Sequence, residues 1–393
     1  MSTATVDCGQ GKSPLPACYT KGFPMPSRYA QWMYDWEHRL TSVDNNRVVR
    51  PLEWGVEWAR DWPCRNGYAP GAIANPEKFF LDYNRRILAA SDEFYSYAPP
   101  KDFRLETREV QVFSTRQVPD PRLEAKVRGT HAEFLRFTSP VRTPYAENNL
   151  VNACWFPVRG RRAVVLLPHW NSDAISYVAL CRVFNLLGIA VLRLSMPYHD
   201  IRMPAEIKRA DYAVSANIGR TLDAVRQGVV DIRCCLDWLE QQGYSNLGIV
   251  GTSLGSCLAF IAAAHDSRIR VAAFNHASTY FADVVWHGQS TRHIRQGIEQ
   301  QIDLEELRRV WLAISPMSFF EQFARWPKRS LIVYAKYDLT FLPEFSREIV
   351  GEFARHNLDH KVTVLPCGHY TTGETPFQYI DGWHLASFLR TAF

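Results

Sequence analysis

Ser253 is the residue whose surroundings most clearly suggest chemistry. It lies between Gly251 and Gly255 in the stretch LGIVGTSLGSCLAF, residues 247–260. A Gly-x-Ser-x-Gly motif between a strand and a helix is typical of a nucleophile elbow, a sharp turn that exposes the serine hydroxyl above a sheet. The same five residues also occur in ordinary Gly/Ser turns. The motif therefore predicts a nucleophile only if a base and an acid accompany it.

A candidate acid and a candidate base follow later in the chain. Asp338 ends the apolar run SLIVYAKYD, and His369 ends the run KVTVLPCGH. In the order Ser253, Asp338, His369, the histidine would take the serine proton and the aspartate would orient the imidazole. Taken singly, Asp338 could be a helix or turn cap, and His369 a hydrogen-bonded histidine at a strand end. Asp283 is an alternative acid that we favour less than Asp338.

A serine hydrolase also needs backbone N–H groups that stabilise the oxyanion of the tetrahedral intermediate. Leu254 follows the nucleophile, so we expect its N–H to be one donor. The second donor should come from PHWNSD, residues 168–173, where the N–H of Trp170 is the first choice and that of His169 the second. The Trp170 side chain could equally be a simple packing residue.

Other polar residues lie near the same predicted edge of the sheet. The loop MPYHDIRMP, residues 196–204, contains His199 and Arg202, which could contact a substrate carbonyl or carboxylate together with His169. A loop held by its own hydrogen bonds is the alternative explanation, and it is the more common one. We expect His384, in the last helix, to be structural, and Cys367 not to be a nucleophile.

Strand-like runs alternate with helical ones over most of the chain. An amphipathic pattern at Leu222, Val225, Val229, Ile232 and Leu236 predicts a helix of about five turns. The alternation favours an α/β fold with a mostly parallel sheet, whose chemistry lies at the carboxyl ends of the strands. The expected strands are residues 102–113, 132–137, 149–158, 161–168, 187–197, 246–251, 268–276, 330–338 and 361–369.

Residues 1–100 differ from the rest and contain five of the twelve tryptophans. We expect them to form a helical arm or cap, with Asn75-Pro76 opening a helix that runs to about Tyr95. The helical spacing of Trp54, Trp58 and Trp62 fits this arm. Residues 98–101 would link it to a catalytic domain at 101–393, in which residues 279–325 form a helical, lid-like insertion. A membrane or oligomer contact is the alternative role of the arm, but packing over the active-site edge is favoured.

The overall composition excludes several classes of protein. Hydrophobic residues make up 47% and charged residues 22% of the 393, with a net charge of +5, so neither disorder nor nucleic-acid binding is expected. The nine cysteines are irregularly spaced without a C-x-x-C pair, which predicts reduced thiols and no structural zinc. No signal peptide and no apolar run long enough for a transmembrane helix are evident. The expected location is cytoplasmic.

The stretches LLPHWN, GTSLGS, VYAKYD and PCGHY resemble the α/β-hydrolase superfamily over about residues 130–393. Within it, the chain is similar to soluble serine esterases and dienelactone-hydrolase-like proteins. The resemblance implies an eight-stranded, mostly parallel sheet, a Ser-His-Asp triad and no cofactor or metal. Many members have His-Gly after the third strand, whereas this chain has Pro168-His169.

The function expected from these residues is cleavage of a carboxylic ester or thioester through an acyl-enzyme. Amide, lactone or carbon–carbon bond hydrolysis would use the same triad, and a ligand-binding homologue without catalysis is the alternative from another class. The expected partner is a small ester-like molecule, and a homo-oligomer is left open.

Overall fold

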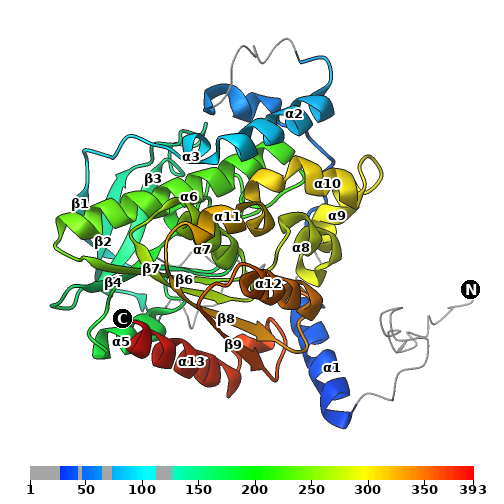
Figure 1. The fold of residues 1–393 in the computed structure, drawn as a ribbon. Helices are drawn as coiled ribbons and strands as arrows, with labels where there is room; N and C mark the ends of the chain where they lie inside the picture. Colours follow the sequence, from blue (N-terminus) through cyan, green and yellow to red (C-terminus); the bar gives the residue numbers. More distant parts are fainter. Residues whose placement is uncertain (1–26, 43–46, 64–72, 112–124, 126) are drawn as a thin grey trace, which may run out of the picture.

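The computed structural model describes residues 27–42, 47–63, 73–111, 125 and 127–393. Its centre is a sheet of nine strands in the order β1-β2-β3-β5-β4-β6-β7-β8-β9. Helices cover both faces of this sheet (Figure 1). The strands are β1 (Arg104–Glu109), β2 (His131–Thr138), β3 (Leu150–Phe156), β4 (Arg162–Leu167), β5 (Ala190–Leu194), β6 (Asn246–Thr252), β7 (Ile269–Asn275), β8 (Arg329–Ala335) and β9 (His360–Leu365).

The sheet is antiparallel at one edge and parallel elsewhere. β1, β2, β3 and β5 pair antiparallel to their neighbours in that order, whereas β5, β4, β6, β7, β8 and β9 form a parallel series. The chain passes from β4 to β5 on one side and then returns across β4 to β6 on the other. This reversal is a topological switch point, beside which open α/β sheets bind their ligands.

Successive side chains of a strand point to opposite faces of the sheet, so the core has two layers. On β4, Ala163, Val165 and Leu167 belong to one buried cluster, while Val164 and Leu166 belong to the other. The first layer contains α6 (Ile218–Gln241), α7 (Leu254–His265) and α12 (Pro343–Arg355). The second contains α1 (Arg28–Ser42), α5 (Val178–Leu186) and α13 (Phe377–Ala392). Apolar side chains thus point to both faces of the sheet, and helices cover both faces.

The described part of the arm shares a core with the sheet. Asn75 caps α2 (Pro76–Ala89) as expected, by accepting a hydrogen bond from the Lys78 N–H. The helix expected to reach Tyr95 ends at Ala89, and a separate short helix, α3 (Ser91–Phe94), follows. Of the three tryptophans with helical spacing, Trp58 alone lies in a helix, the 3-10 helix η2 (Val56–Asp61), while Trp54 precedes it and Trp62 follows it. Trp62, Phe80 and Phe94 join the cluster that also contains α6 and α7.

The insertion between β7 and β8 consists of short helices. Asp303 and Glu306 form a capping box, which explains why α10 (Leu304–Val310) begins at Leu304. Its elements are α8 (Phe281–His287), η5 (Gln289–Thr291), α9 (Arg292–Ile298), α10 (Leu304–Val310), η6 (Leu312–Ile314), η7 (Pro316–Phe319) and α11 (Phe320–Ala324).

The number of strands departs from the family resemblance. The resemblance implied eight, whereas the described residues form nine, because β1 adds an antiparallel strand beside β2. The six cysteines in the described ranges are buried free thiols, while Cys8, Cys18 and Cys64 lie outside those ranges. Within the described ranges, every helix is too short or too polar to cross a lipid bilayer.

Candidate active site

Ser253 occupies the one-residue turn between β6 and α7. Its backbone angles are φ 58° and ψ −121°, a strained conformation for a residue with a side chain. A Cβ atom on Gly251 would lie 2.2 Å from the carbonyl oxygen of Gly255, and one on Gly255 would lie 2.6 Å from that of Leu167. The two glycines therefore allow the close backbone approach that a sharp strand-to-helix turn requires.

Ser253, His369 and Asp338 form a continuous chain of hydrogen-bond contacts. Ser253 Oγ lies 3.0 Å from His369 Nε2. His369 Nδ1 lies 2.9 Å from Asp338 Oδ2. Since an ionised carboxylate only accepts hydrogen bonds, the proton of the neutral imidazole lies on Nδ1. The lone pair of Nε2 then faces the serine hydroxyl, so the three side chains that the sequence placed at separate strand ends come together.

The environment of Asp338 favours its ionised form. Its Oδ1 accepts hydrogen bonds from the N–H groups of Thr340 and Phe341, each at 2.7 Å. Although burial acts to raise the pKa of Asp338, the neighbouring His369 and the donated hydrogen bonds hold that pKa well below its usual value. The carboxylate therefore supplies a negative charge beside the imidazole.

The pKa of His369 is shifted in the opposite direction, upward. Burial acts to lower the pKa of His369, but the charge of Asp338 and its hydrogen bond raise that pKa above the ordinary histidine value. The ring of Phe341 stacks on the imidazole with centroids 5.2 Å apart and an interplanar angle of 10°. This stacking restrains the rotation of the imidazole, and the raised pKa makes it a stronger base.

His276 is a second histidine at the site, and sequence reasoning did not assign it a role. Its Nδ1 lies 3.0 Å from Asp338 Oδ2, the same oxygen that His369 contacts. Its backbone has φ 55°, directly after the end of β7. Burial lowers the pKa of His276, so the ring is neutral and donates through Nδ1. Its position at a strand end was the available signal, but the pairing with Asp338 needed the fold.

The nitrogen and oxygen atoms of His276, Asp338 and His369 that could bind a metal lie within 4.8 Å of one another. The same Nδ1 atoms lie at hydrogen-bond distance from Asp338 Oδ2. A metal at their centre would have to displace both N–H protons. Because His369 Nε2 also faces a serine hydroxyl, the arrangement fits an acid–base chain better than a metal site.

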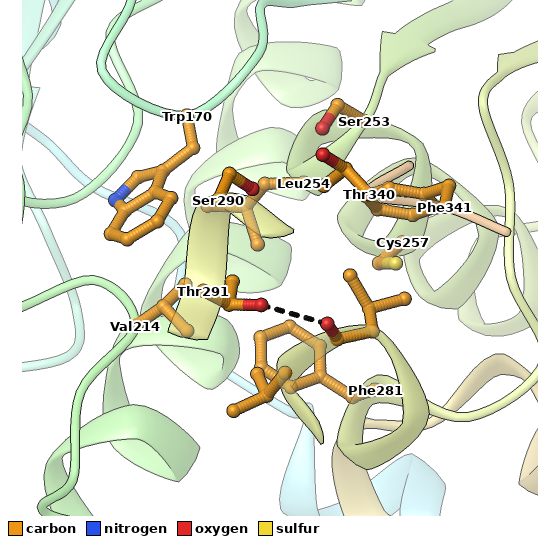
Figure 2. A pocket seen from close by; sticks show the side chains of 12 residues that line it. Trp170, Val214, Ser253, Leu254, Cys257, Phe281, Ser290, Thr291, Thr340 and Phe341 are labelled. Carbon is orange, nitrogen blue, oxygen red and sulfur yellow. Dashed lines mark hydrogen bonds between the residues drawn. The ribbon is translucent and has the colours of Figure 1, made fainter. Parts of the chain in front are cut away.

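A small, mostly apolar pocket opens beside Ser253, which lies at its top in Figure 2. It is small and partly open to solvent. The insertion provides the lower wall, where Thr291 Oγ1 donates a 2.9 Å hydrogen bond to the carbonyl of Val284. The lining residues are Trp170, Val214, Ser253, Leu254, Cys257, Phe281, Val284, Val285, Ser290, Thr291, Thr340 and Phe341.

The two residues predicted to supply oxyanion donors both line this pocket. Leu254 begins α7, whose N-terminus favours negative charge. Trp170 follows β4, and its indole Nε1 donates a 2.9 Å hydrogen bond to the carbonyl of Ala210. Its ring stacks on His293 at 6.1 Å between centroids. The Trp170 side chain therefore has the packing role that was left open, while the backbone donors remain a prediction.

His169 and His199 hold the loop after β4. His169 Nδ1 lies 2.9 Å from the hydroxyl of Tyr177, and burial lowers the pKa of His169 to about 4. His199 is buried, with Nδ1 2.8 Å from the carbonyl of Pro197 and Nε2 accepting from the N–H of Asn171 at 3.0 Å. Both nitrogens of His199 are thus used by the protein, which corrects its predicted contact with a substrate. It instead fixes the loop that carries Trp170.

Arg202 requires the same correction. Its side chain is fully buried and pairs with Asp231 at 2.8 Å. The guanidinium also donates to the carbonyls of Asn148 and Ser195. An arginine whose donors are engaged away from the pocket lining cannot bind a substrate without breaking a buried ion pair, so its role is to hold the loop after β5.

The less favoured candidates also have other partners. Asp283 pairs with Arg308 at 2.6 Å in the insertion. Burial raises the pKa of the Cys367 thiol to about 12, which leaves it protonated and a poor nucleophile. His384 lies in α13 beside the exposed Trp383.

Comparison with known proteins adds evidence on the fold. No protein-family model and no curated protein sequence matches the chain. Among solved structures, acetyl xylan esterase 1 from Thermoanaerobacterium sp. JW/SL YS485 is similar with a TM-score of 0.52 and 13% identity, covering 90% of this chain and 98% of the esterase. An acetyl xylan esterase from Paenibacillus sp. R4 has a TM-score of 0.51 and 13% identity, covering 88% and 98%.

The acylaminoacyl peptidase of Pyrococcus horikoshii is also similar, with a TM-score of 0.52 and 10% identity. The match covers 75% of this chain but only 48% of the peptidase, so the chain spans about half of that protein's length. At these identities the likeness concerns the fold. The strand order, the turn at Ser253 and these structural matches agree, and the chain has the α/β-hydrolase fold.

Proposed function

We propose that this protein is a serine hydrolase that cleaves a carboxylic ester or thioester with a short, apolar acyl group. The observation that carries this proposal is the hydrogen-bonded chain Ser253–His369–Asp338 at the mouth of an apolar pocket. The strained turn that presents Ser253 and the opposite pKa shifts of His369 and Asp338 support it.

In this mechanism Ser253 Oγ attacks the acyl carbonyl while His369 Nε2 takes the hydroxyl proton. Asp338 stabilises the imidazolium that forms. The N–H groups of Leu254 and Trp170 stabilise the oxyanion. His369 then returns the proton to the leaving alcohol or thiol, and the acyl-enzyme forms. Water then attacks the acyl group while His369 takes its proton. The imidazolium gives that proton to Ser253 Oγ as the acyl–oxygen bond breaks, which releases the acid and the free serine.

The size and the apolar lining of the pocket limit the length and the charge of the acyl group that fits it. Phe281, Val285 and Cys257 offer apolar surface but no charged partner, so a neutral hydrocarbon chain fits better than a charged one. The space between the lining side chains of α7 and α8 is small and has room for only a few carbon atoms. We therefore expect acetyl to butyryl groups to be accepted more readily than octanoyl groups.

A series of p-nitrophenyl esters from acetate to octanoate tests this proposal, with acetyl p-nitroanilide as the amide comparison. We expect kcat/KM to be highest for the short esters, and hydrolysis by Ser253→Ala to be lower by a factor of roughly 10⁴ or more. Faster turnover of the anilide than of every ester would overturn the ester assignment. Equal rates for the wild type and Ser253→Ala would overturn the proposal as a whole.

A further inference from the structure

Glu37, on α1, is a buried carboxylate that contacts the turn directly after His369. Its Oε1 accepts the N–H of Tyr370 at 2.8 Å. Its Oε2 accepts the N–H of Thr371 at 2.9 Å and the hydroxyl of the same residue at 3.0 Å. The two residues are separated from Glu37 by more than three hundred positions in the sequence. A side chain of the N-terminal arm thus completes the hydrogen bonding of the loop that carries the base.

The fit between Glu37 and this loop is close. Gly368, the residue before His369, has no side chain, and a Cβ atom there would lie 2.4 Å from the carboxyl carbon of Glu37. Glu37 is fully shielded from solvent. Among the described residues, no arginine or lysine pairs with its carboxylate. The carboxylate therefore relies on N–H and O–H donors of the loop for its stabilisation, and those donors rely on it.

Further contacts of α1 fasten it to the same region. The Tyr29 hydroxyl donates a hydrogen bond to the carbonyl of Pro366, just before the loop. At the other end of the helix, the Thr41 hydroxyl donates to Gln289 Oε1 at 2.7 Å, on the insertion beside the pocket. The helix is therefore tied both to the loop that bears the base and to the wall of the pocket.

Charge links Glu37 to the acid–base pair. Burial, followed by the charge of Asp338, raises the pKa of Glu37 to about 7, whereas His369 acts to lower it. In its ionised form, Glu37 adds its negative charge to that of Asp338 in raising the pKa of His369. Among the described residues, other titratable groups near this site include Cys367 beside Glu37, Tyr29 and Asp381 near Cys367, and His276 and His169 beside His369.

We infer that Glu37 is a positioning residue for the general base: its carboxyl group holds the 370–371 turn that fixes His369. The role in the reaction rests on the proposed serine-hydrolase function. The arm is then part of the active site and not only a cover for the sheet.

Glu37→Gln tests this role while preserving side-chain size. The amide keeps one acceptor oxygen but turns an N–H₂ group toward loop donors, so part of the hydrogen bonding is lost. Asp35→Asn is the matched control, because Asp35 lies on the same helix, is exposed, and accepts a hydrogen bond from Gln31 that asparagine can keep. Thermal unfolding of both variants establishes that they are folded.

In ester hydrolysis we expect Glu37→Gln to lower kcat by roughly 10- to 100-fold with little change in KM, because the base is misplaced while the pocket is intact. The acid limb of its kcat/KM profile should move to lower pH, since loss of a negative charge lowers the pKa of His369. Asp35→Asn should leave kcat within about twofold and the profile in place. A wild-type kcat and pH profile for Glu37→Gln would overturn the inference.

Two measurements decide the inference without any substrate. By NMR, the pKa of His369 should fall in Glu37→Gln, and the amides of Tyr370 and Thr371 should exchange with solvent about tenfold faster or more. Unchanged exchange and an unchanged His369 pKa would overturn the positioning role even in an active enzyme. If instead the wild type shows no Ser253-dependent hydrolysis, the proposed function fails while these measurements still report on Glu37.

Discussion

At the scale of single residues, the site depends on one carboxylate with four donors. Asp338 accepts hydrogen bonds from two backbone N–H groups and from the Nδ1 atoms of His276 and His369. These donors keep the carboxylate ionised although it is buried. The same charge keeps the proton of His369 on Nδ1 and raises the pKa of that imidazole. The chemistry proposed for Ser253 therefore depends on the hydrogen bonds that stabilise the ionised carboxylate of Asp338.

The pH dependence of hydrolysis follows from these pKa shifts. His369 must be neutral to accept a proton, so kcat/KM should rise as the pH passes through the pKa of His369, above the ordinary value of an exposed histidine. Asp338→Asn removes the negative charge, which lowers that pKa and moves the acid limb to lower pH. It should also reduce kcat by roughly 10³- to 10⁴-fold. A profile from pH 5 to 9 that is identical in both proteins would contradict the charge effect of Asp338 on His369.

His276→Asn tests the second contact of Asp338. Asparagine tolerates the positive φ of this position, so the substitution removes the imidazole donor with little backbone strain. We expect kcat to fall by about 10- to 100-fold, less than in Asp338→Asn, because three donors to the carboxylate remain. Steady-state kinetics of the two variants side by side measures this order. A greater loss in His276→Asn would show that His276 acts in some other way.

At the scale of elements, the site lies where strands end and helices begin. Ser253 follows the end of β6, Asp338 follows β8 and His369 follows β9. The insertion forms one wall of the pocket. The arm also contacts that wall. Arg47 donates a 2.6 Å hydrogen bond to the carbonyl of Ser290, and its guanidinium lies over the ring of Trp170. Elements distant in sequence thus set the geometry of one small cavity.

Gly255→Ala should damage the turn that presents Ser253. The new methyl group would lie 2.6 Å from the carbonyl oxygens of both Leu167 and Pro168, which are backbone atoms that cannot rotate away. We expect a loss of about 1–3 kcal/mol in the free energy of unfolding, together with most of the activity. Gly351→Ala in α12 is the control, since no atom lies within 4 Å of its new methyl group. That control should be neutral or slightly stabilising in denaturant titrations.

Phe281→Leu tests whether the insertion limits the acyl group. A smaller side chain in the lower wall enlarges the pocket, so the ratio of kcat/KM for octanoate to that for acetate should rise by roughly tenfold. The control is Phe319→Leu, which alters a buried phenylalanine of the same insertion that does not line the pocket. An equal change of the ratio in both variants would mean that general loosening, not the pocket wall, sets the preference.

At the scale of the whole molecule, a single sheet divides two apolar layers. The described arm residues around Trp62 pack in one layer with α6 and α7, and α1 packs in the other with α5 and α13. The arm therefore reaches both faces of the sheet. The proposed catalytic residues and Glu37 of α1 meet at its carboxyl edge.

Much of this arrangement could be predicted because its signals are local. The apolar runs that end at Asp338 and His369, and the two glycines around Ser253, each mark a strand end within a few residues. The strand end before His276 was a signal that did not reveal its role, and Glu37 gave no local signal, because the partners of both residues lie far away in the sequence. The substrate contacts considered for His199 and Arg202 are wrong, and the more common explanation, a loop held by its own hydrogen bonds, is confirmed. The choice could not be made from the sequence, since burial and the ion pair between Arg202 and Asp231 depend on tertiary packing.

The central claim is that Ser253 is a nucleophile activated by His369, and a fluorophosphonate probe tests it most directly. The phosphonate forms a covalent bond only with a serine whose proton can be removed, and mass spectrometry locates the modified residue. We expect one label on the wild-type protein, at Ser253, and none on folded Ser253→Ala. An unlabelled wild type, or equal labelling of the two proteins, would contradict it.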